Sequence, residues 1–282
     1  MIVIIPSMRL LSSFASNTSM QAVMSNANVQ QKENINLLYS YEENDEIRIT
    51  QYFKDWNEKS KKLTKTEYEN ELEENLYKIF KVVYQPYNMV PFINEQMLDY
   101  FEHDLIKVIN QAPYIVVQNQ LHYTIEDLKD TNEDVYDEYD EYLLTLMDSK
   151  NEIKTINNFY PQIDIDFNKV LYLTDEYEVE IISFLGGEER PFSEKNIMAP
   201  AIPKGETEKR YQWLRKYIPI LYGHWGGYWH LPTHPEILNV YINKELTHAI
   251  ANYRIGYKFG FAELKKVNGD WVLIKALMNG ME

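Results

Sequence analysis

The chain contains no cysteine among its 282 residues. This absence excludes disulfides, thiol catalysis, zinc sites built from thiolates and iron–sulfur clusters. Basic residues are also scarce, since 28 Lys and Arg stand against 43 Asp and Glu. The net charge of −15 argues against duplex DNA or RNA, because phosphate binding depends on clustered Lys and Arg. We therefore expect no nucleic-acid partner.

Long hydrophobic runs are missing as well. No apolar run approaches the roughly 20 residues that a membrane helix needs, so we expect no transmembrane span. The start, MIVIIPSMRLLSSFAS, is apolar and is followed by a polar stretch of the kind found behind a cleavage site. Residues 1 to about 16 are either an export signal, giving an exported or periplasmic protein, or part of a disordered tail of a cytoplasmic one.

Catalytic signatures are absent too. The sequence has no GxSxG elbow, no Walker loop and no GxGxxG after a strand. We therefore expect no cofactor, whether a nucleotide or another kind. Paired carboxylates remain possible, but 43 acids supply too many candidate pairs to name one.

The first two thirds of the chain show helical periodicity. Apolar residues recur every three or four positions, and caps or prolines mark several ends, including Thr64 and Thr174 as N-caps. The acids cluster between residues 41 and 223, and the segment 126–148 is typical of a solvated acidic helix. The expected helices are 64–83, 94–110, 126–148, 175–185 and 206–218, with a strand over 113–125.

The last quarter changes to a strand pattern. Asn268-Gly269 between two alternating segments predicts a two-residue hairpin, which would pair Lys266 with Trp271, Leu264 with Leu273 and Glu263 with Ile274. Helices followed by a meander indicate an α+β fold, with N-terminal and central helices packed on a C-terminal curved antiparallel sheet. We expect a leader or disordered tail over 1–40, a mainly helical acidic region over 41–160, and an α+β region over 161–282 that could form one domain with it.

Two segments resemble known proteins. The ending AIANYRIGYKFGFAELKKVNGDWVLIKA resembles the closing strands of the nuclear transport factor two-like family. That resemblance implies a curved sheet that wraps around helices and encloses a pocket. The segment HWGGYWHLPTHPEI is similar to uncharacterised bacterial proteins and implies no activity.

The segment from Tyr222 to Pro235, YGHWGGYWHLPTHP, holds three of the six histidines and two of the five tryptophans. The spacing of His230 and His234 imitates the two ligands of a zinc-protease helix, but Pro232 excludes that helix. In an extended chain the two rings would start about 13 Å apart, too far for one zinc ion, whereas a turn at Leu231-Pro232 would bring them closer and leave zinc as an alternative. We therefore expect an ordered loop anchored by its aromatic residues, with His224, Trp225, Trp229 and His230 as weak ligand-binding candidates.

A second candidate lies on the strand THAIANYRIGY. Alternation places Ala249, Ala251, Tyr253, Ile255 and Tyr257 on one face, which suits packing against helices. The other face carries His248, Ile250, Asn252 and Arg254. We expect this polar face to be solvent-exposed; the alternative is that His248, Asn252 and Arg254 bind an anionic or polar ligand under a curved sheet, or that Arg254 pairs with an acid.

Calcium is the remaining metal to consider. DTNEDVYDEYDE places acids and an amide at four EF-hand positions, but Val135 stands where glycine permits the turn. In DIDFNK the acids and the amide are also correctly spaced, but Lys169 stands where glycine permits the turn. We expect no metal site.

The sequence thus favours an acidic protein that binds a small molecule or a protein partner, with the ligand unknown. The alternative is a hydrolase-like enzyme with a pocket between the His224 to His234 loop and the sheet. There His224 or His248 would act as acid or base and Arg254 would hold an anion.

Overall fold

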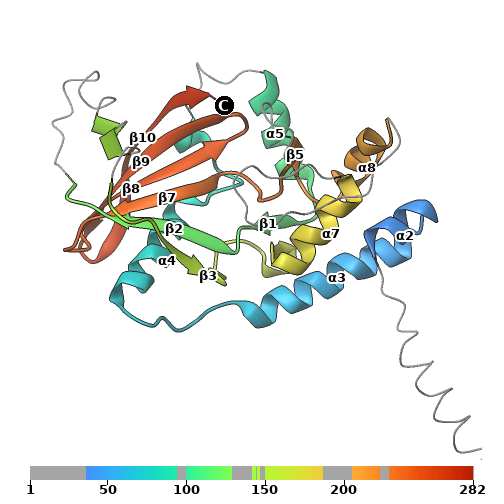
Figure 1. Cartoon of the computed structure of the whole chain (residues 1–282), viewed down its shortest axis with the longest axis horizontal. Helices are drawn as coiled ribbons and strands as arrows, with labels where there is room; N and C mark the ends of the chain where they lie inside the picture. The colour runs from blue at the N-terminus through green and yellow to red at the C-terminus, as the bar shows by residue number, and fades with distance from the viewer. Residues whose placement is uncertain are drawn as a thin grey trace, which may run out of the picture.

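The computed structural model describes residues 36–93, 100–128, 142–143, 145–146, 150–186, 205–222 and 229–281. Within them the chain is α+β, with six α-helices and a large, mostly antiparallel sheet (Figure 1). This confirms the expected fold class. The helices are α2 (Leu37–Glu42), α3 (Glu46–Leu63), α4 (Glu71–Val83), α5 (Tyr100–Gln111), α7 (Asp175–Leu185) and α8 (Glu206–Leu214), with 3₁₀ turns η1 (Val90–Phe92) and η3 (Phe167–Lys169).

The large sheet has six strands in the order β10-β9-β8-β7-β2-β3. Its C-terminal four strands form the expected antiparallel meander, and β2 joins β7 in parallel with Tyr123 opposite Val240. The strands are β2 (Gln120–Ile125), β3 (Lys154–Asn157), β7 (Glu236–Ile242), β8 (His248–Ile255), β9 (Lys258–Val267) and β10 (Asp270–Met281).

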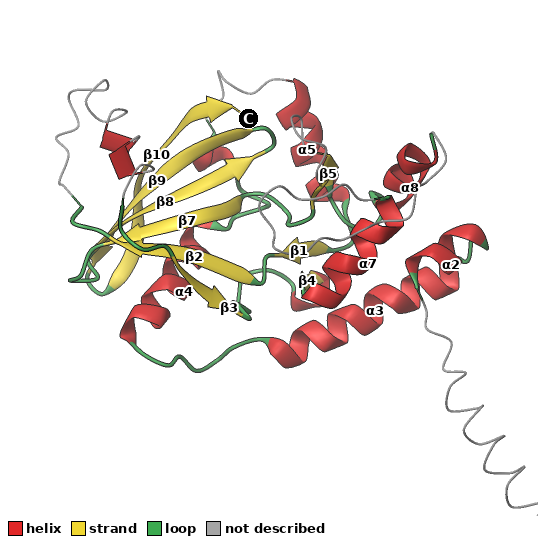
Figure 2. Cartoon of the chain, in the orientation of Figure 1, coloured by secondary structure: helices red, strands yellow, loops and turns green. Residues whose placement is uncertain are grey.

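Two small sheets lie beside it. Strands β5 (Leu221–Tyr222) and β6 (Trp229–His230) form an antiparallel pair, and β1 (Ile115–Val117) and β4 (Val170–Tyr172) form a parallel one. Figure 2 shows β1 and β4 between the large sheet and the helices α3 and α7. The segment 113–125, expected as one strand, is therefore two strands in different sheets.

The main core lies between α4 and one face of the large sheet. Leu76, Phe80 and Val83 of α4 are fully buried against sheet residues such as Ala251 and Leu264. Tyr253 reaches past this core and donates its hydroxyl to the carbonyl oxygen of Phe92, at 2.7 Å. We call the opposite side of the sheet the outer face.

The start of α4 differs from the expectation. Thr64 is not its N-cap, because α3 runs to Leu63 and Thr64 ends that helix. Asn70 caps α4 instead, since its side-chain oxygen accepts the backbone N–H of Glu73 at 2.9 Å.

A second core forms among α2, α3, α7 and α8. It is rich in aromatic rings, including Phe53 and Trp56 of α3 and Tyr177 of α7. Helix α7 has the predicted bounds and ends at Gly186 in the left-handed conformation, although the Thr174 side chain makes no capping bond. Helix α8 ends at Leu214 rather than at residue 218.

The hairpin between β9 and β10 tests the predicted register. Asn268 and Gly269 both have positive φ, as a type I′ turn requires, and Trp271 faces Lys266 while Leu273 faces Leu264. The third pair is wrong, because a β-bulge after Leu273 places Lys275, not Ile274, opposite Glu263.

Several expectations fall partly outside the described residues. Helix α5 is described from Tyr100, so the expected start near residue 94 is not tested. Of the acidic helix expected over 126–148, residues 126–128 are not helical, which corrects its start, whereas residues 142–143 and 145–146 are helical. Residues 1–35, which include the possible leader, also lie outside. Among the described helices, none is long and apolar enough to cross a membrane.

Candidate functional site

Strand β8 separates its side chains between the two faces as predicted. Ala249, Ala251, Tyr253 and Ile255 belong to the main core. The outer face carries His248, Ile250, Asn252 and Arg254. Because the main core supplies hydrophobic packing on one side only, any polar recognition by this sheet falls to the outer face.

The outer face is not solvent-exposed, contrary to the expectation. His248 and Asn252 are each only 6% exposed, and Ile250 is fully buried. The reason is a third apolar cluster, in which Leu143 and Leu146 pack on Tyr241, Ile250 and Phe261. Polar groups on this face therefore lie in a low-dielectric environment, where each needs a hydrogen-bond partner.

Arg254 pairs with an acid, which was one of the alternatives. Its Nη2 lies 2.6 Å from Oε2 of Glu236, directly across the β7–β8 ladder. Burial alone would raise the pKa of Glu236, but the Arg254 guanidinium and the nearby His230 hold it well below its ordinary value. Glu236 is thus ionised, and the charge of Arg254 is largely neutralised within the protein.

The histidines of the loop meet this ion pair. The chain turns between His230 and His234, so their ring centroids lie 5.9 Å apart rather than about 13 Å, and Nδ1 of His230 lies 3.8 Å from Oε2 of Glu236. His234 is fully buried, and the peptide bond to Pro235 is cis.

A hydrogen bond defines the tautomer of His234. Its Nδ1 lies 3.0 Å from the carbonyl oxygen of Arg254, which can only accept, so Nδ1 donates and Nε2 carries the lone pair. Burial, followed by the charge of His230, lowers the pKa of His234 to about 3. The ring is therefore neutral, and its buried Nε2 acceptor has no hydrogen-bond partner.

Two asparagines add similar acceptors. Asn239 of β7 and Asn252 of β8 are cross-strand partners on the outer face. The amide nitrogen of Asn239 donates to Oγ1 of Thr124 at 3.2 Å, but the side-chain oxygens of both asparagines are buried without a donor. We call His234, Asn239 and Asn252 the acceptor cluster.

His248 belongs to a different cluster. It lies six positions from Arg254 on the same strand, which separates their Cα atoms by about 20 Å. Its Nε2 lies 3.1 Å from Oε1 of the buried Glu263, and Lys275 and Lys265 lie 3.6 and 3.8 Å from the same carboxylate. Burial would raise the pKa of Glu263, but the bond from His248 and the two lysines hold it below its ordinary value. Glu263 is therefore ionised and paired within the protein.

Of the remaining predicted residues, only Trp229 is described, and it does not join the acceptor cluster. The Trp229 ring packs in the second core, with its centroid 4.8 Å from that of Tyr222. His224 and Trp225 lie in 223–228, outside the described residues.

Metal ligands were considered on three segments. Across the described residues no group of three or more His, Asp or Glu is placed to hold an ion. In DIDFNK, Asp166 caps η3 and Asp164 pairs with Lys81 at 2.8 Å. The EF-hand-like residues 130–141 lie outside the described part.

Glu236 and Asn239 were not singled out from the sequence. Glu236 and Asn239 become visible once β7 is paired with β8, because they face Arg254 and Asn252. A register argument through the turn at residues 243–247 could have found them, as it did for the last hairpin.

Comparisons with known proteins identify no relative. No protein-family model matches the chain, and no curated protein and no solved structure is significantly similar to it. The functional conclusion therefore depends on the geometry of the site.

Proposed function

We propose that the chain is a binding protein that holds a small ligand rich in hydrogen-bond donors at the acceptor cluster. The observation that carries the proposal is the presence of three buried acceptors without donors around the β7–β8 pair: the side-chain oxygens of the cross-strand partners Asn239 and Asn252, and Nε2 of His234, which precedes β7 and is bonded through Nδ1 to the carbonyl of Arg254.

Buried acceptors of this kind are costly. Each one left without a hydrogen bond destabilises the fold by about 1–3 kcal/mol, so a ligand that donates to them gains affinity from the relief. The positive charge of Arg254 is taken up by Glu236, whose Oε2 lies 2.6 Å from its Nη2. A neutral polyol or sugar matches this environment better than an anion does.

The family resemblance, export and the enzyme alternative remain proposals. A six-stranded, mostly antiparallel sheet packed on helices supports the α+β part of the resemblance to nuclear transport factor two-like proteins, while membership of that family and export stay proposals. One form of the enzyme alternative combines His248 with Arg254. About 20 Å of strand separates these two residues, which is too far for both to act on one small substrate.

The test compares two buried asparagines. Asn252→Leu removes an acceptor that has no donor, so the ligand-free variant should be about 1 kcal/mol more stable than the wild type. Asn57→Leu is the matched control, because its amide donates to the carbonyls of Phe167 and Val170 and its loss should destabilise the protein. Urea unfolding measures both.

Ligand binding is measured by thermal shift with a panel of neutral monosaccharides and polyols and a panel of mono- and dicarboxylates. We expect at least one neutral compound to raise the melting temperature of the wild type and of Asn57→Leu but not of Asn252→Leu. A response to carboxylates only, or equal responses in all three proteins, would refute the proposal.

A further inference from the structure

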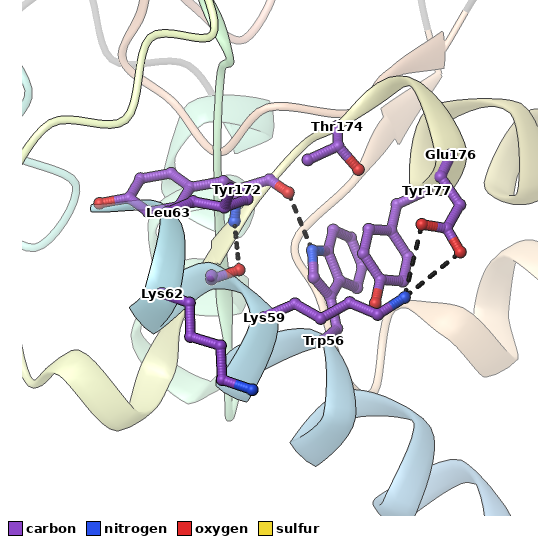
Figure 3. Close-up of a pocket in the computed structure, with 9 residues that line it drawn as sticks. Trp56, Lys59, Lys62, Leu63, Tyr172, Thr174, Glu176 and Tyr177 are labelled. Atoms are coloured by element: carbon purple, nitrogen blue, oxygen red, sulfur yellow. Dashed lines mark hydrogen bonds and ion pairs between the residues drawn. The ribbon is translucent and has the colours of Figure 1, made fainter. Parts of the chain in front are cut away.

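A cleft of about 260 Å³ opens between the C-terminal half of α3 and the start of α7 (Figure 3). Its size suits a compact ligand, since an engineered protein cavity of about 150 Å³ already binds benzene. The lining residues are Trp56, Lys59, Ser60, Lys62, Leu63, Tyr172, Thr174, Glu176 and Tyr177.

The walls of this cleft are aromatic and held in place. Trp56 and Tyr177 stack with their centroids 4.2 Å apart, and the Trp56 indole N–H donates to the carbonyl oxygen of Tyr172 at 2.8 Å. The backbone N–H of Tyr172 in turn donates to Oγ of Ser60 at 2.9 Å. These bonds orient the rings before any ligand arrives, which lowers the entropic cost of binding.

One wall of the cleft is an apolar side chain that the fold leaves uncovered. Leu63, at the end of α3, is 38% exposed although it is a large hydrophobic residue. In Figure 3 Leu63 and Tyr172 lie on one side, and Trp56 and Tyr177 lie on the other. A ligand with an apolar body would cover this surface.

The charges at the mouth do not cancel. Lys59 pairs with Glu176 at 3.3 Å and lies over the Tyr177 ring. Lys62 makes no hydrogen bond or ion pair within the described part of the chain, and the nearby Glu58 is bound by Lys61 at 2.7 Å. Glu58, one helical turn before Lys62, feels the charge of both Lys61 and Lys62, so two ammonium groups share one carboxylate at this end of α3, in a protein whose net charge is −15.

We propose that this cleft binds a small monoanionic carboxylate with an aromatic body. The ring packs against the exposed side chain of Leu63, next to the buried indole of Trp56, and the carboxylate pairs with the ammonium group of Lys62. This site is separate from the acceptor cluster and does not depend on it.

The test follows the Trp56 indole N–H by two-dimensional ¹H–¹⁵N NMR, with Trp56→Phe to assign the resonance. The probes are 3-phenylpropionate, the neutral 3-phenylpropanamide and the cationic 3-phenylpropylamine. We expect a saturable shift with the carboxylate, an apparent Kd at least five-fold weaker for the amide, and the weakest binding for the amine.

Two lysines of the same helix separate a charge effect from a general one. Lys62→Gln should weaken 3-phenylpropionate at least five-fold and leave the amide unchanged, whereas Lys54→Gln, an exposed position of α3 outside the cleft, should change neither. No saturable shift of the Trp56 resonance, an amine that binds as tightly as the carboxylate, or equal effects of the two substitutions would overturn the proposal.

Discussion

At the scale of single residues, His234 shows how a position in the fold determines protonation. The carbonyl of Arg254 holds its Nδ1 proton, and burial removes the water that would stabilise a second one. An imidazole with a pKa of about 3 is a poor proton acceptor near neutral pH, but it is a permanent hydrogen-bond acceptor. This property suits ligand recognition better than acid–base catalysis.

The same residue predicts a pH dependence of stability. Because the pKa of His234 falls from 6.5 to about 3 on folding, the unfolded chain binds the extra proton. The contribution of neutral His234 to the free energy of unfolding is fully present above pH 6.5. It is lost as the pH falls toward 3, at up to about 1.4 kcal/mol per pH unit. Urea unfolding between pH 7.5 and 5 measures this slope, in a window above the ordinary titration range of the carboxylates.

His234→Asn is the informative variant, because its side-chain N–H can still donate to Arg254 while the ionisation is removed. We expect its stability to fall less steeply between pH 6.5 and 5 than that of the wild type. The half-buried His122, whose pKa burial also lowers, contributes equally to both proteins. Parallel slopes would show that His234 is not held neutral.

At the scale of elements, two glycines of the β9–β10 hairpin differ in what a side chain would meet. Gly260 of β9 has no side chain where the chain of β10 passes, and a Cβ there would meet the carbonyl oxygen of Leu277 and the Cα of Met278, at 2.9 Å for the latter. At Gly280 of β10 a Cβ would meet only the ring of Phe259. Backbone cannot move aside as a ring can.

This difference predicts unequal costs for two similar substitutions. Gly260→Ala should lower the free energy of unfolding by about 3 kcal/mol, the upper end for overpacking, because the backbone of β10 must shift. Gly280→Ala should cost about 1 kcal/mol or less, because the Phe259 ring can rotate. Chemical denaturation of both variants checks the order, and a larger loss for Gly280→Ala would contradict it.

Elements with local signals were predicted from the sequence, and those that depend on distant residues were not. Helix α7 ends at Gly186 and the last hairpin turns at Asn268-Gly269, because each signal lies within the element itself. The bulge after Leu273 changes a register that pattern alone cannot follow. Helix α3 was missed although Asp45 caps it, because its many Lys and Glu residues obscure the buried stripe through Phe53 and Trp56.

The candidate site was predicted in part for the same reason. Alternation placed Asn252 and Arg254 on one face correctly, since period two is a local property of a strand. Burial of that face depends on Leu143 and Leu146, which are far away in the sequence. The separation of His248 from the ion pair follows from strand length alone and could have been inferred.

At the scale of the whole molecule, the two cores share a wall. In the parallel pair β1–β4, Ile115 and Val170 point into the main core, and their neighbours Val116 and Leu171 point into the second one. Neither core can lose this pair without exposing the other. We therefore expect the described part of the chain to unfold in a single cooperative transition.

The prediction is tested in a Trp271→Phe background, where the remaining described tryptophans lie in or against the second core. Leu264→Ala creates a cavity in the main core and should lower the free energy of unfolding by about 2–5 kcal/mol. The unfolding midpoint followed by tryptophan fluorescence should fall with the midpoint followed by far-UV circular dichroism. A fluorescence midpoint that stays in place would mean that the two cores unfold independently.

The parallel pairing of β2 with β7 has a consequence for synthesis. Ile125 cannot meet Ile242 until the ribosome has made β3, β4, α7 and α8, which all lie between the two strands. The edge of β2 must wait in the nascent chain while the C-terminal hairpins are still untranslated. The large sheet is thus completed only after β7 to β10 have been translated. Until then the edge of β2 is unpaired on that side, and we expect chaperones that shield strand edges to bind it.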